Sequence, residues 1–183
     1  GCDMILACNN PVGLNEIVET LSREEFHFSP LQLDKMRGGA PVNYEKLKES
    51  EIEIVAHLSQ KVFGEWNLET FLSRIKNHPR GYLGVAYVDH KPIGFKLGYE
   101  DDRKTFYSWL GAVHTDYRGL GIARELMENQ HQWCRAQKYA KIQTKTQNRY
   151  KAMLLLNLKS GFDVIGTHAS DKGKIKILLE KRL

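Results

Sequence analysis

The chain is poor in cysteine and lacks any long apolar run. Its three cysteines, Cys2, Cys8 and Cys134, are too few and too scattered for a disulfide framework or a zinc site. No apolar run approaches the ~20 residues of a membrane span. Ile5-Leu6-Ala7-Cys8 resembles a lipoprotein cleavage box, but no charged segment and long apolar region precede it, so we expect no signal peptide. We therefore expect a cytoplasmic protein without a membrane anchor.

The sequence also lacks the residue spacing of a metal site, because none of the seven histidines is closely paired with a cysteine or a carboxylate at such spacing. We therefore expect no metal site. What the chain does have is a composition typical of soluble proteins, with 42% hydrophobic and 27% charged residues. Its 183 residues lie within the usual range of about 100–200 residues for one domain.

Positive charge is concentrated toward the C-terminus. Residues 135–183 carry 12 Lys and Arg against 3 Asp and Glu, whereas residues 1–134 carry 15 against 19. Such a basic segment is typical of a solvated surface, a polyanionic cofactor site or a nucleic-acid surface. No arginine-rich tract, helix-turn-helix pattern or aromatic RNA-binding motif accompanies the charge, so we expect no nucleic-acid partner.

The first 40 residues are difficult to assign to a sheet. Residues 12–25 have helical periodicity, and Ser29-Pro30 and Gly38-Gly39-Ala40-Pro41 interrupt the segment that follows. We therefore predict a helical appendage over residues 1–40 and a main domain over residues 41–183. The oligomeric state of the protein stays open, and a homodimer is one alternative.

The main domain is predicted to mix strands and helices, with two hairpins and one β-α-β crossover. The predicted strands cover residues 42–47, 82–88, 92–99, 105–113, 141–146, 164–168 and 175–179, and the predicted helices cover residues 51–63, 67–77, 121–138 and 150–160. This order indicates an α/β fold with a mixed, mostly antiparallel sheet flanked by helices.

A glycine-rich turn lies between the predicted strand over residues 105–113 and the predicted helix over residues 121–138. Arg118-Gly119-Leu120-Gly121-Ile122-Ala123 would aim several backbone N–H groups at one point, as a phosphate group requires. The turn does not fit the dinucleotide fingerprint, because Arg124 stands at the third glycine position. It does not fit the Walker pattern either, because no Gly-Lys-Ser/Thr is present.

Two segments resemble the GNAT N-acyltransferase superfamily. Arg118-x-x-Gly121-x-Ala123 is similar to that family's Arg/Gln-x-x-Gly-x-Gly/Ala signature. Asn148, Ala152, Leu155 and Gly161-Phe162 are similar to its Asn-Ala-Leu-Gly-Phe segment. The strand and helix order from Val42 onward also matches. This resemblance implies a GNAT-like sheet, an acetyltransferase activity and acetyl-CoA or another acyl-CoA as cofactor.

The resemblance implies a cofactor site at the turn, with the acyl group beside a splay in the strand near Ala112 and Val113. A backbone N–H exposed there would polarise the thioester carbonyl. The residues implied in cofactor binding are Ala112, Val113, Arg118, Gly119, Leu120, Gly121, Ile122, Ala123, Arg124 and Asn148.

The catalytic residues depart from the family pattern. The position of the family's general acid, a tyrosine, is occupied by Asn157, whose amide can hydrogen-bond the departing sulfur but cannot supply a proton. The alternatives for protonating the departing thiolate are water and Tyr150. Glu100 is the first candidate for the general base and Glu65 the second, while a base acting through ordered water would leave no trace in the sequence.

The acceptor is expected to be a small-molecule or peptide amine that takes the acyl group by direct transfer. The family resemblance implies that the loop with Glu65 and Trp66 borders the acceptor, and Tyr107 is an aromatic candidate for the same pocket. The alternative is a catalytically weak module that binds CoA or a protein partner, and Asn157 is the observation that motivates it. His114 is interpreted as a turn residue whose backbone matters, and Cys134 as inert packing in a helix.

Overall fold

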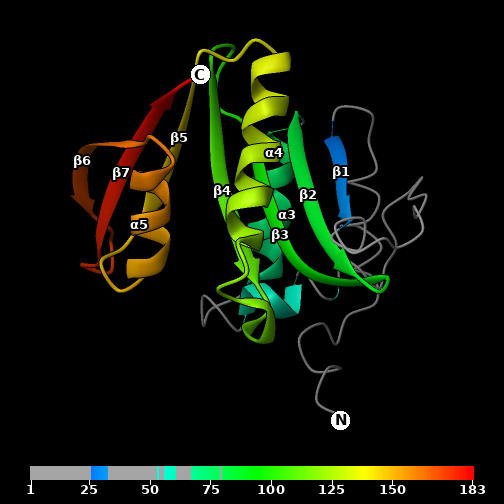
Figure 1. Ribbon diagram of the computed structural model, residues 1–183. Coiled ribbons are helices and arrows are strands. Elements are labelled where there is room, and N and C mark those ends of the chain that lie inside the picture. The colour runs from blue at the N-terminus through cyan, green and yellow to red at the C-terminus, as the bar shows by residue number, and fades with distance from the viewer. Residues whose placement is uncertain (1–25, 33–52, 54–55, 61–66, 79) are drawn as a thin grey trace.

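The computed structural model describes residues 26–32, 53, 56–60, 67–78 and 80–183. Within these residues the chain forms one seven-stranded sheet with helices on both faces (Figure 1). The predicted helix over residues 12–25 and the predicted strand over residues 42–47 lie outside the described residues. Among the described helices, none is long and apolar enough to cross a membrane.

The sheet is mixed and mostly antiparallel. Its strands are β1 (Phe26–Gln32), β2 (Gly81–Val88), β3 (Lys91–Glu100), β4 (Thr105–Val113), β5 (Lys141–Thr146), β6 (Asp163–Ala169) and β7 (Ile175–Arg182), in the order β1-β2-β3-β4-β5-β7-β6. The β1–β2 and β4–β5 pairs are parallel, and the other four pairs are antiparallel. The predicted fold class is therefore confirmed, with β4 as the central strand.

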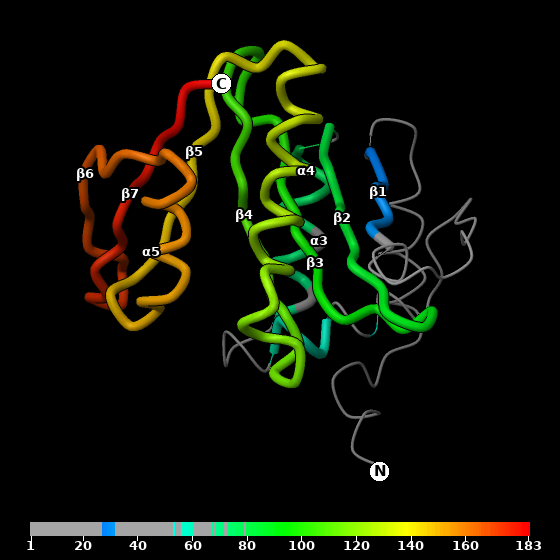
Figure 2. Tube along the Cα trace, in the orientation of Figure 1, coloured from blue at the N-terminus to red at the C-terminus, as the bar shows by residue number. Residues whose placement is uncertain are grey.

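The described helical elements include α3 (Leu68–Asn77), the 3₁₀ turn η2 (Thr115–Tyr117), α4 (Ile122–Ala136) and α5 (Lys151–Lys159). Residues 56–60 are helical as well. Asn67 caps α3, as predicted, by accepting a 2.8 Å hydrogen bond from the Thr70 N–H. α4 covers β2, β3 and β4 from one side, and α3 lies behind the same strands (Figures 1 and 2).

The main core lies between α4, α5 and the sheet. Its buried members are Tyr82, Phe106, Met127, Cys134, Tyr139, Ile142, Phe162, Ile177 and Leu179. Cys134 is part of this core, and burial raises the pKa of its thiol, so the thiol stays protonated and unreactive. The prediction of inert packing at Cys134 is therefore consistent with its surroundings.

β4 and β5 pair over only three residues and then separate. Thr105–Tyr107 of β4 pair with Lys141–Gln143 of β5, whereas β5 pairs with β7 along its whole length. The Thr144 hydroxyl donates a 2.8 Å hydrogen bond to the Ser108 carbonyl at the point of divergence. Beyond it, no described strand pairs with the β5-facing edge of β4. The two strands meet at one end and spread apart toward the other (Figure 2).

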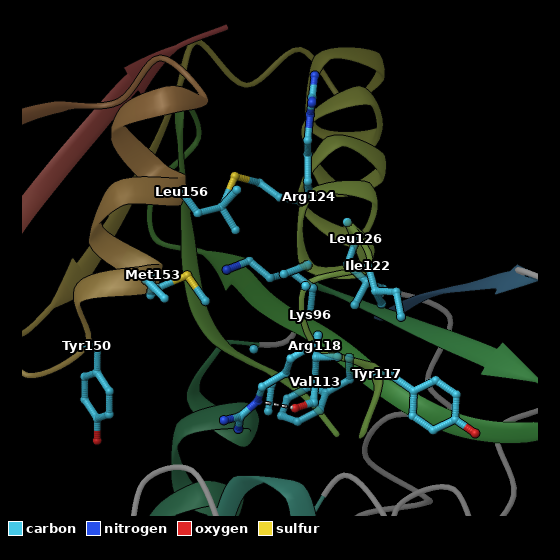
Figure 3. A pocket seen from close by; sticks show the side chains of 18 of the residues that line it. Lys96, Val113, Tyr117, Arg118, Ile122, Arg124, Leu126, Tyr150, Met153 and Leu156 are labelled. Atoms are coloured by element: carbon cyan, nitrogen blue, oxygen red, sulfur yellow. Dashed lines mark hydrogen bonds between the residues drawn. The ribbon is translucent and has the colours of Figure 1, made fainter. Parts of the chain in front are cut away.

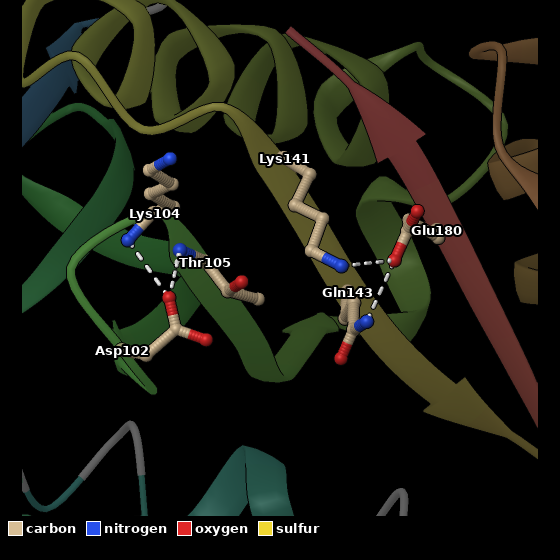
Figure 4. Close-up of polar contacts among 6 residues, drawn as sticks. All are labelled: Asp102, Lys104, Thr105, Lys141, Gln143 and Glu180. Atoms are coloured by element: carbon tan, nitrogen blue, oxygen red, sulfur yellow. Dashed lines mark hydrogen bonds and ion pairs between the residues drawn. The ribbon is translucent and has the colours of Figure 1, made fainter.

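Two polar clusters stabilise the ends of these strands (Figure 4). The Asp102 carboxylate accepts 2.8 Å hydrogen bonds from the Lys104 and Thr105 N–H groups and closes the loop between β3 and β4. On β7, Glu180 accepts hydrogen bonds from Gln143 at 2.7 Å and Lys141 at 3.0 Å. These bonds lower the pKa of Glu180 and tie β5 to β7 rather than to β4.

Most predicted elements of the main domain are confirmed within one or two residues, but the N-terminal prediction needs a correction. Residues 26–32 form β1, which pairs with β2 at the edge of the sheet, so this part of the predicted appendage is neither helical nor separate from the sheet. Pro30 is tolerated because an edge strand leaves one row of N–H groups without a ladder partner. The boundary near residue 40 stays a prediction.

Gly161 ends α5 in the left-handed conformation, with φ +88°. The Phe162 N–H bonds to the Asn157 carbonyl and the Gly161 N–H bonds to the Leu158 carbonyl, which is the Schellman arrangement. Gly161→Ala should lower the free energy of unfolding by about 1 kcal/mol, because an L residue is strained there. Urea unfolding measures this. Gly166→Ala is the control, since its Cβ would meet no atom within 4 Å at an ordinary φ. Equal effects at the two positions would contradict the prediction.

Candidate active site

The turn between β4 and α4 is held open by two glycines in the left-handed region. Gly119 has φ +76° and Gly121 has φ +83°, and a Cβ at either position would meet no atom within 4 Å. Gly121 is the N-cap of α4 and makes no side-chain cap bond, so the first N–H groups of the helix have no acceptor within it. Conformation, rather than crowding, therefore requires glycine at these positions, and the turn can approach a ligand closely.

Arg118 secures this turn to the end of β4. Its Nε donates a 3.1 Å hydrogen bond to the Val113 carbonyl (Figure 3). His114 also contributes through its backbone, because its N–H bonds to the Ile93 carbonyl at 2.7 Å. Its ring Nδ1 accepts a bond from the Asp116 N–H at 3.2 Å. The path from β4 into α4 is thus set by the His114 backbone together with the side chains of Arg118 and His114, so the interpretation that only the backbone of His114 matters is incomplete.

A cavity of about 520 Å³ runs from this turn along the separated edge of β4 to α5. It is lined by Phe95, Lys96, Gly111, Ala112, Val113, Tyr117, Arg118, Gly119, Gly121, Ile122, Ala123, Arg124, Leu126, Met127, Arg149, Tyr150, Lys151, Ala152, Met153 and Leu156. Its interior is mainly apolar, and the basic side chains other than Lys96 are exposed. This size and lining suit a ligand with an apolar arm and an anionic end.

The charge of the cavity is one-sided. Arg118 and Arg124 come from the turn and the first turn of α4, and Arg149 and Lys151 come from the start of α5. No aspartate or glutamate lines the cavity among the described residues. Four exposed cations and the unpaired N–H groups of α4 together favour a ligand that carries several phosphates. The residues present therefore fit the phosphate-bearing acyl-CoA that the sequence resemblance implies.

Lys96 is the buried cation of this cavity and was missed in the sequence analysis. Its residue is 7% exposed, and its side chain crosses the cavity toward α5 (Figure 3). Burial lowers the pKa of Lys96 to about 8. No carboxylate in the described part of the chain pairs with its ammonium group. An isolated lysine in the apolar run from Ile93 to Tyr99 is the sequence signal that could have identified it.

His131 lies on α4 near the same region but does not line the cavity. Its Nδ1 is 3.4 Å from the Lys181 Nζ on β7. Burial, followed by the charges of Lys181 and Lys96, lowers the pKa of His131 to about 3. The imidazole is therefore neutral at physiological pH and is a poor proton acceptor. It is not the missing general base.

The cavity contains most of the residues predicted for cofactor binding. Those that line it are Ala112, Val113, Arg118, Gly119, Gly121, Ile122, Ala123 and Arg124. Leu120 is 64% exposed and is not among the lining residues. Asn148 does not line the cavity either, whereas the next two residues along the chain, Arg149 and Tyr150, do. The strands diverge from Ser108 onward, so Ala112 and Val113 lie well inside the separated part of β4.

The two predicted catalytic residues are not among the lining residues. Glu100 lies at the end of β3 opposite the turn, where it pairs with Phe106 in register. Its carboxylate accepts a 2.7 Å hydrogen bond from the Tyr139 hydroxyl and forms a 3.2 Å ion pair with Arg80. Asn157 is 2% exposed, and its carbonyl belongs to the cap of α5. The structure thus supports neither residue as a group that reaches the cavity.

Tyr107 belongs to an aromatic cluster on the α3 side of the sheet. Its ring lies 5.3 Å from that of Tyr99, whose hydroxyl accepts a 2.9 Å bond from Arg74. Trp109 stacks on Phe71 at 5.4 Å in the same cluster. Burial raises the pKa of Tyr107, so its hydroxyl stays protonated. The other two predicted acceptor residues, Glu65 and Trp66, lie outside the described residues.

The lowered pKa of Lys96 predicts a cost to stability. An exposed lysine titrates near 10.5, so the unfolded chain holds this proton more tightly than the native chain, whose Lys96 titrates near 8. At 1.36 kcal/mol per pH unit, burying the charged form costs up to about 3 kcal/mol below pH 8. Lys96→Met should therefore raise the free energy of unfolding at pH 7 by about 1–3 kcal/mol.

This gain should shrink between pH 8 and pH 10.5, because the unfolded parent protein binds more protons than the native one in that window and its stability rises with pH. Denaturant unfolding at pH 7 and pH 10 measures the difference. Lys91→Met, an exposed position on the same strand, is the control. A loss of stability for Lys96→Met at pH 7, or a gain that does not depend on pH, would refute the prediction.

Similarity to solved structures concerns the fold and covers most of the chain. Ard1 from Thermoplasma volcanium is 18% identical, with a TM-score of 0.67 over 75% of this chain and 94% of that one. The ribosomal-protein-S18-alanine N-acetyltransferase of Escherichia coli is 18% identical, with a TM-score of 0.63 over 74% and 90%. A GNAT family acetyltransferase from Elizabethkingia anophelis, solved with acetyl-CoA bound, is 19% identical, with a TM-score of 0.57 over 79% and 93%.

No curated protein matches the chain by sequence. The model of the acetyltransferase (GNAT) family matches residues 44–162. This range includes α3, the strands β2 to β5, η2, the glycine turn, α4 and α5, and it ends at Phe162 just after α5. The match therefore covers every described element that lines the cavity. The chain belongs to the GNAT family of acetyltransferases.

Proposed function

We propose that this protein is an N-acetyltransferase that moves an acetyl group from acetyl-CoA to a primary amine by direct transfer. The observation that carries the proposal is the cavity along the separated edge of β4, which begins at the glycine turn and is bordered by exposed cations. Membership of the acetyltransferase family supports acetyl-CoA as the acyl donor. The Elizabethkingia anophelis neighbour was solved with this molecule bound.

The chain offers separate groups for the two ends of the donor. The N–H groups at the start of α4, with Arg118 and Arg124, would hold the pyrophosphate. Arg149 and Lys151 would contact the remaining phosphate. The apolar wall formed by Met153 and Leu156 suits the pantetheine arm. Bound in this way, acetyl-CoA supplies an activated acyl group at the separated edge of β4.

β4 is placed to activate the thioester carbonyl. Its edge toward β5 has no strand partner from Ser108 onward in the described part of the chain, so its N–H groups on that edge are available to a carbonyl oxygen. Fixed backbone donors in a site that excludes water favour the charge that develops during acyl transfer. The Ala112 and Val113 segment, predicted for this role, lies in the separated part.

Proton transfer is proposed to use water rather than the two residues predicted from the sequence. Glu100 is bound to Arg80 and Tyr139, and Asn157 is buried and does not line the cavity. A thiolate with a pKa near ~8.5 leaves readily near neutral pH, so the reaction does not require a dedicated acid. A water-mediated base would accept the proton of the attacking amine.

The proposed acceptor is a peptide or small-molecule amine that approaches from the side opposite the turn. Tyr107 lies there and stays a proposed contact, and Glu65 and Trp66 stay predictions. The Escherichia coli neighbour acts on an alanine of ribosomal protein S18, according to its name, which makes a peptide α-amine one acceptor to test. The acceptor class is a proposal of its own, because the similarity of 18% concerns the fold.

Arg124→Gln should weaken CoA binding about three- to tenfold, because it removes one cation from the phosphate end of the cavity. The salt dependence of binding should fall as well, since fewer charges remain to be screened. Calorimetric titration with CoA measures both effects. Arg135→Gln, in the last turn of the same helix, is the control and should leave the dissociation constant unchanged. Equal weakening by the two variants would argue against a phosphate site at the start of α4.

Turnover should require an amine. Steady-state thiol release from acetyl-CoA should rise when peptides with a free N-terminus, polyamines or aminoglycosides are added, and the acetylated product should appear by mass spectrometry. The same acceptors with blocked amines should give no continued steady-state release, because repeated direct transfer requires a neutral amine as nucleophile. Steady-state release that is independent of every added amine would count against direct transfer.

A second candidate is a GNAT module that binds CoA or a protein partner with little transfer. Two observations favour it: Asn157 stands at the general acid position, and no carboxylate lines the cavity among the described residues. Tight CoA binding combined with no turnover on any acceptor would favour this module over the enzyme. Both candidates share the cavity and differ only in whether the chain completes the transfer.

A further inference from the structure

Lys96 presents inside the cavity the same chemical group as the proposed acceptor, a primary amine. Two lysines line the cavity, but Lys151 is exposed at the start of α5, whereas Lys96 is buried on β3. A buried lysine without a partner is unfavourable for the fold, so its presence calls for a chemical explanation. An ammonium that only attracted phosphates would be better placed at the exposed end, beside Arg124 and Arg149.

The path of the Lys96 side chain depends on Gly111, its cross-strand neighbour on β4. A Cβ at residue 111 would lie 3.0 Å from the Lys96 Cδ and 3.5 Å from its Nζ. The absence of a side chain at residue 111 therefore lets Lys96 lie across β4. Its Nζ reaches the separated part of the strand and points toward the wall formed by Met153 and Leu156 (Figure 3).

The surroundings of Lys96 favour its neutral form. The titratable residues that share the cavity lining with it are Tyr117 from η2, Arg118 and Arg124 from the turn and α4, and Arg149, Tyr150 and Lys151 from the segment that enters α5, and none of them is a carboxylate. The nearby His131 on α4, which contacts Lys181 of β7, is neutral. Burial lowers the pKa of Lys96 to about 8 and leaves part of its population as free amine near neutral pH. This amine is a nucleophile that needs no carboxylate base.

We propose that Lys96 is a site of self-acetylation, in which the chain transfers the acetyl group of its own donor to the Lys96 Nζ. The inference rests on the proposed function, because it requires acetyl-CoA in the cavity. The neutral Nζ attacks the thioester carbonyl carbon, so that a C–N bond forms and the C–S bond breaks. The electron pair leaves with the sulfur as CoA thiolate, which takes up the proton released by the nitrogen. The products are Nε-acetyl-Lys96 and CoA thiol.

The first test is incubation of the full chain with acetyl-CoA in the absence of any acceptor, followed by peptide mapping by mass spectrometry. An acetyl group should accumulate at Lys96 at least about tenfold faster than at Lys151, because positioning in the cavity outweighs exposure to solvent. Lys151 is the internal control, as it lines the same cavity but is exposed. Excess desulfo-CoA should suppress labelling at Lys96 and leave labelling of surface lysines unchanged.

Lys96→Arg should abolish the labelled peptide while the protein still binds CoA in calorimetry. Labelling of exposed lysines at rates equal to or above that of Lys96 would mean spontaneous chemical acetylation and would overturn the proposal. Binding of acetyl-CoA without any label at Lys96 would overturn this proposal alone. Failure of acetyl-CoA to bind at all would overturn the proposed function as well, so the two failures are distinguishable.

A second measurement needs neither donor nor turnover. The side-chain resonances of Lys96, assigned by their loss in Lys96→Arg, should titrate near pH 8, well below the ordinary lysine value of 10.5. The same resonances should shift when CoA is added, because the Nζ faces the cavity. An ordinary lysine titration, or resonances that do not respond to CoA, would show that Lys96 does not reach the cavity as a free amine and would overturn the proposal.

Discussion

The separation of β4 from β5 is the constraint on which the rest of this structure depends. The two strands share only three residue pairs before β5 continues with β7 and β4 continues with β3. The Thr144 hydroxyl still bonds to the Ser108 carbonyl just beyond these pairs. A strand edge in the middle of a sheet is normally paired, because unpaired buried backbone groups are costly. Here it forms the wall of a cavity, where a ligand can supply the missing partners.

Electrostatics then divide the cavity into two parts. The exposed cations around the start of α4 and α5 lie in solvent, where their charge costs little in folding and suits the proposed phosphate site. Lys96 lies where water is excluded, and there the charged form of a lysine is disfavoured. Basic side chains are therefore suited to binding anions at the exposed end of the cavity, and the buried lysine is suited to nucleophilic chemistry in its interior. This division connects the fold with both the proposed activity and the proposed modification site.

Much of the fold could be predicted because its signals are local. The cap at Asn67, the glycine that ends α5 and the apolar run of β4 each depend on a few neighbouring residues, and all three are confirmed. The edge strand β1 could not be predicted, because its pairing with β2 joins residues more than 50 positions apart. Its Ser29-Pro30 pair also reads as an interruption unless the strand is known to lie at an edge.

The sequence by itself determined the order of strands and helices, the glycine turn and the family to which the chain belongs, since these are carried by short motifs and by residues close along the chain. Only the tertiary structure decided which charged groups meet. It paired Glu100 with Arg80 and Tyr139, buried Asn157 and brought Lys96 across Gly111 into the cavity. The physical reason is that the state of an ionisable side chain depends on its solvation and its partners, and both come from strands and helices distant in sequence.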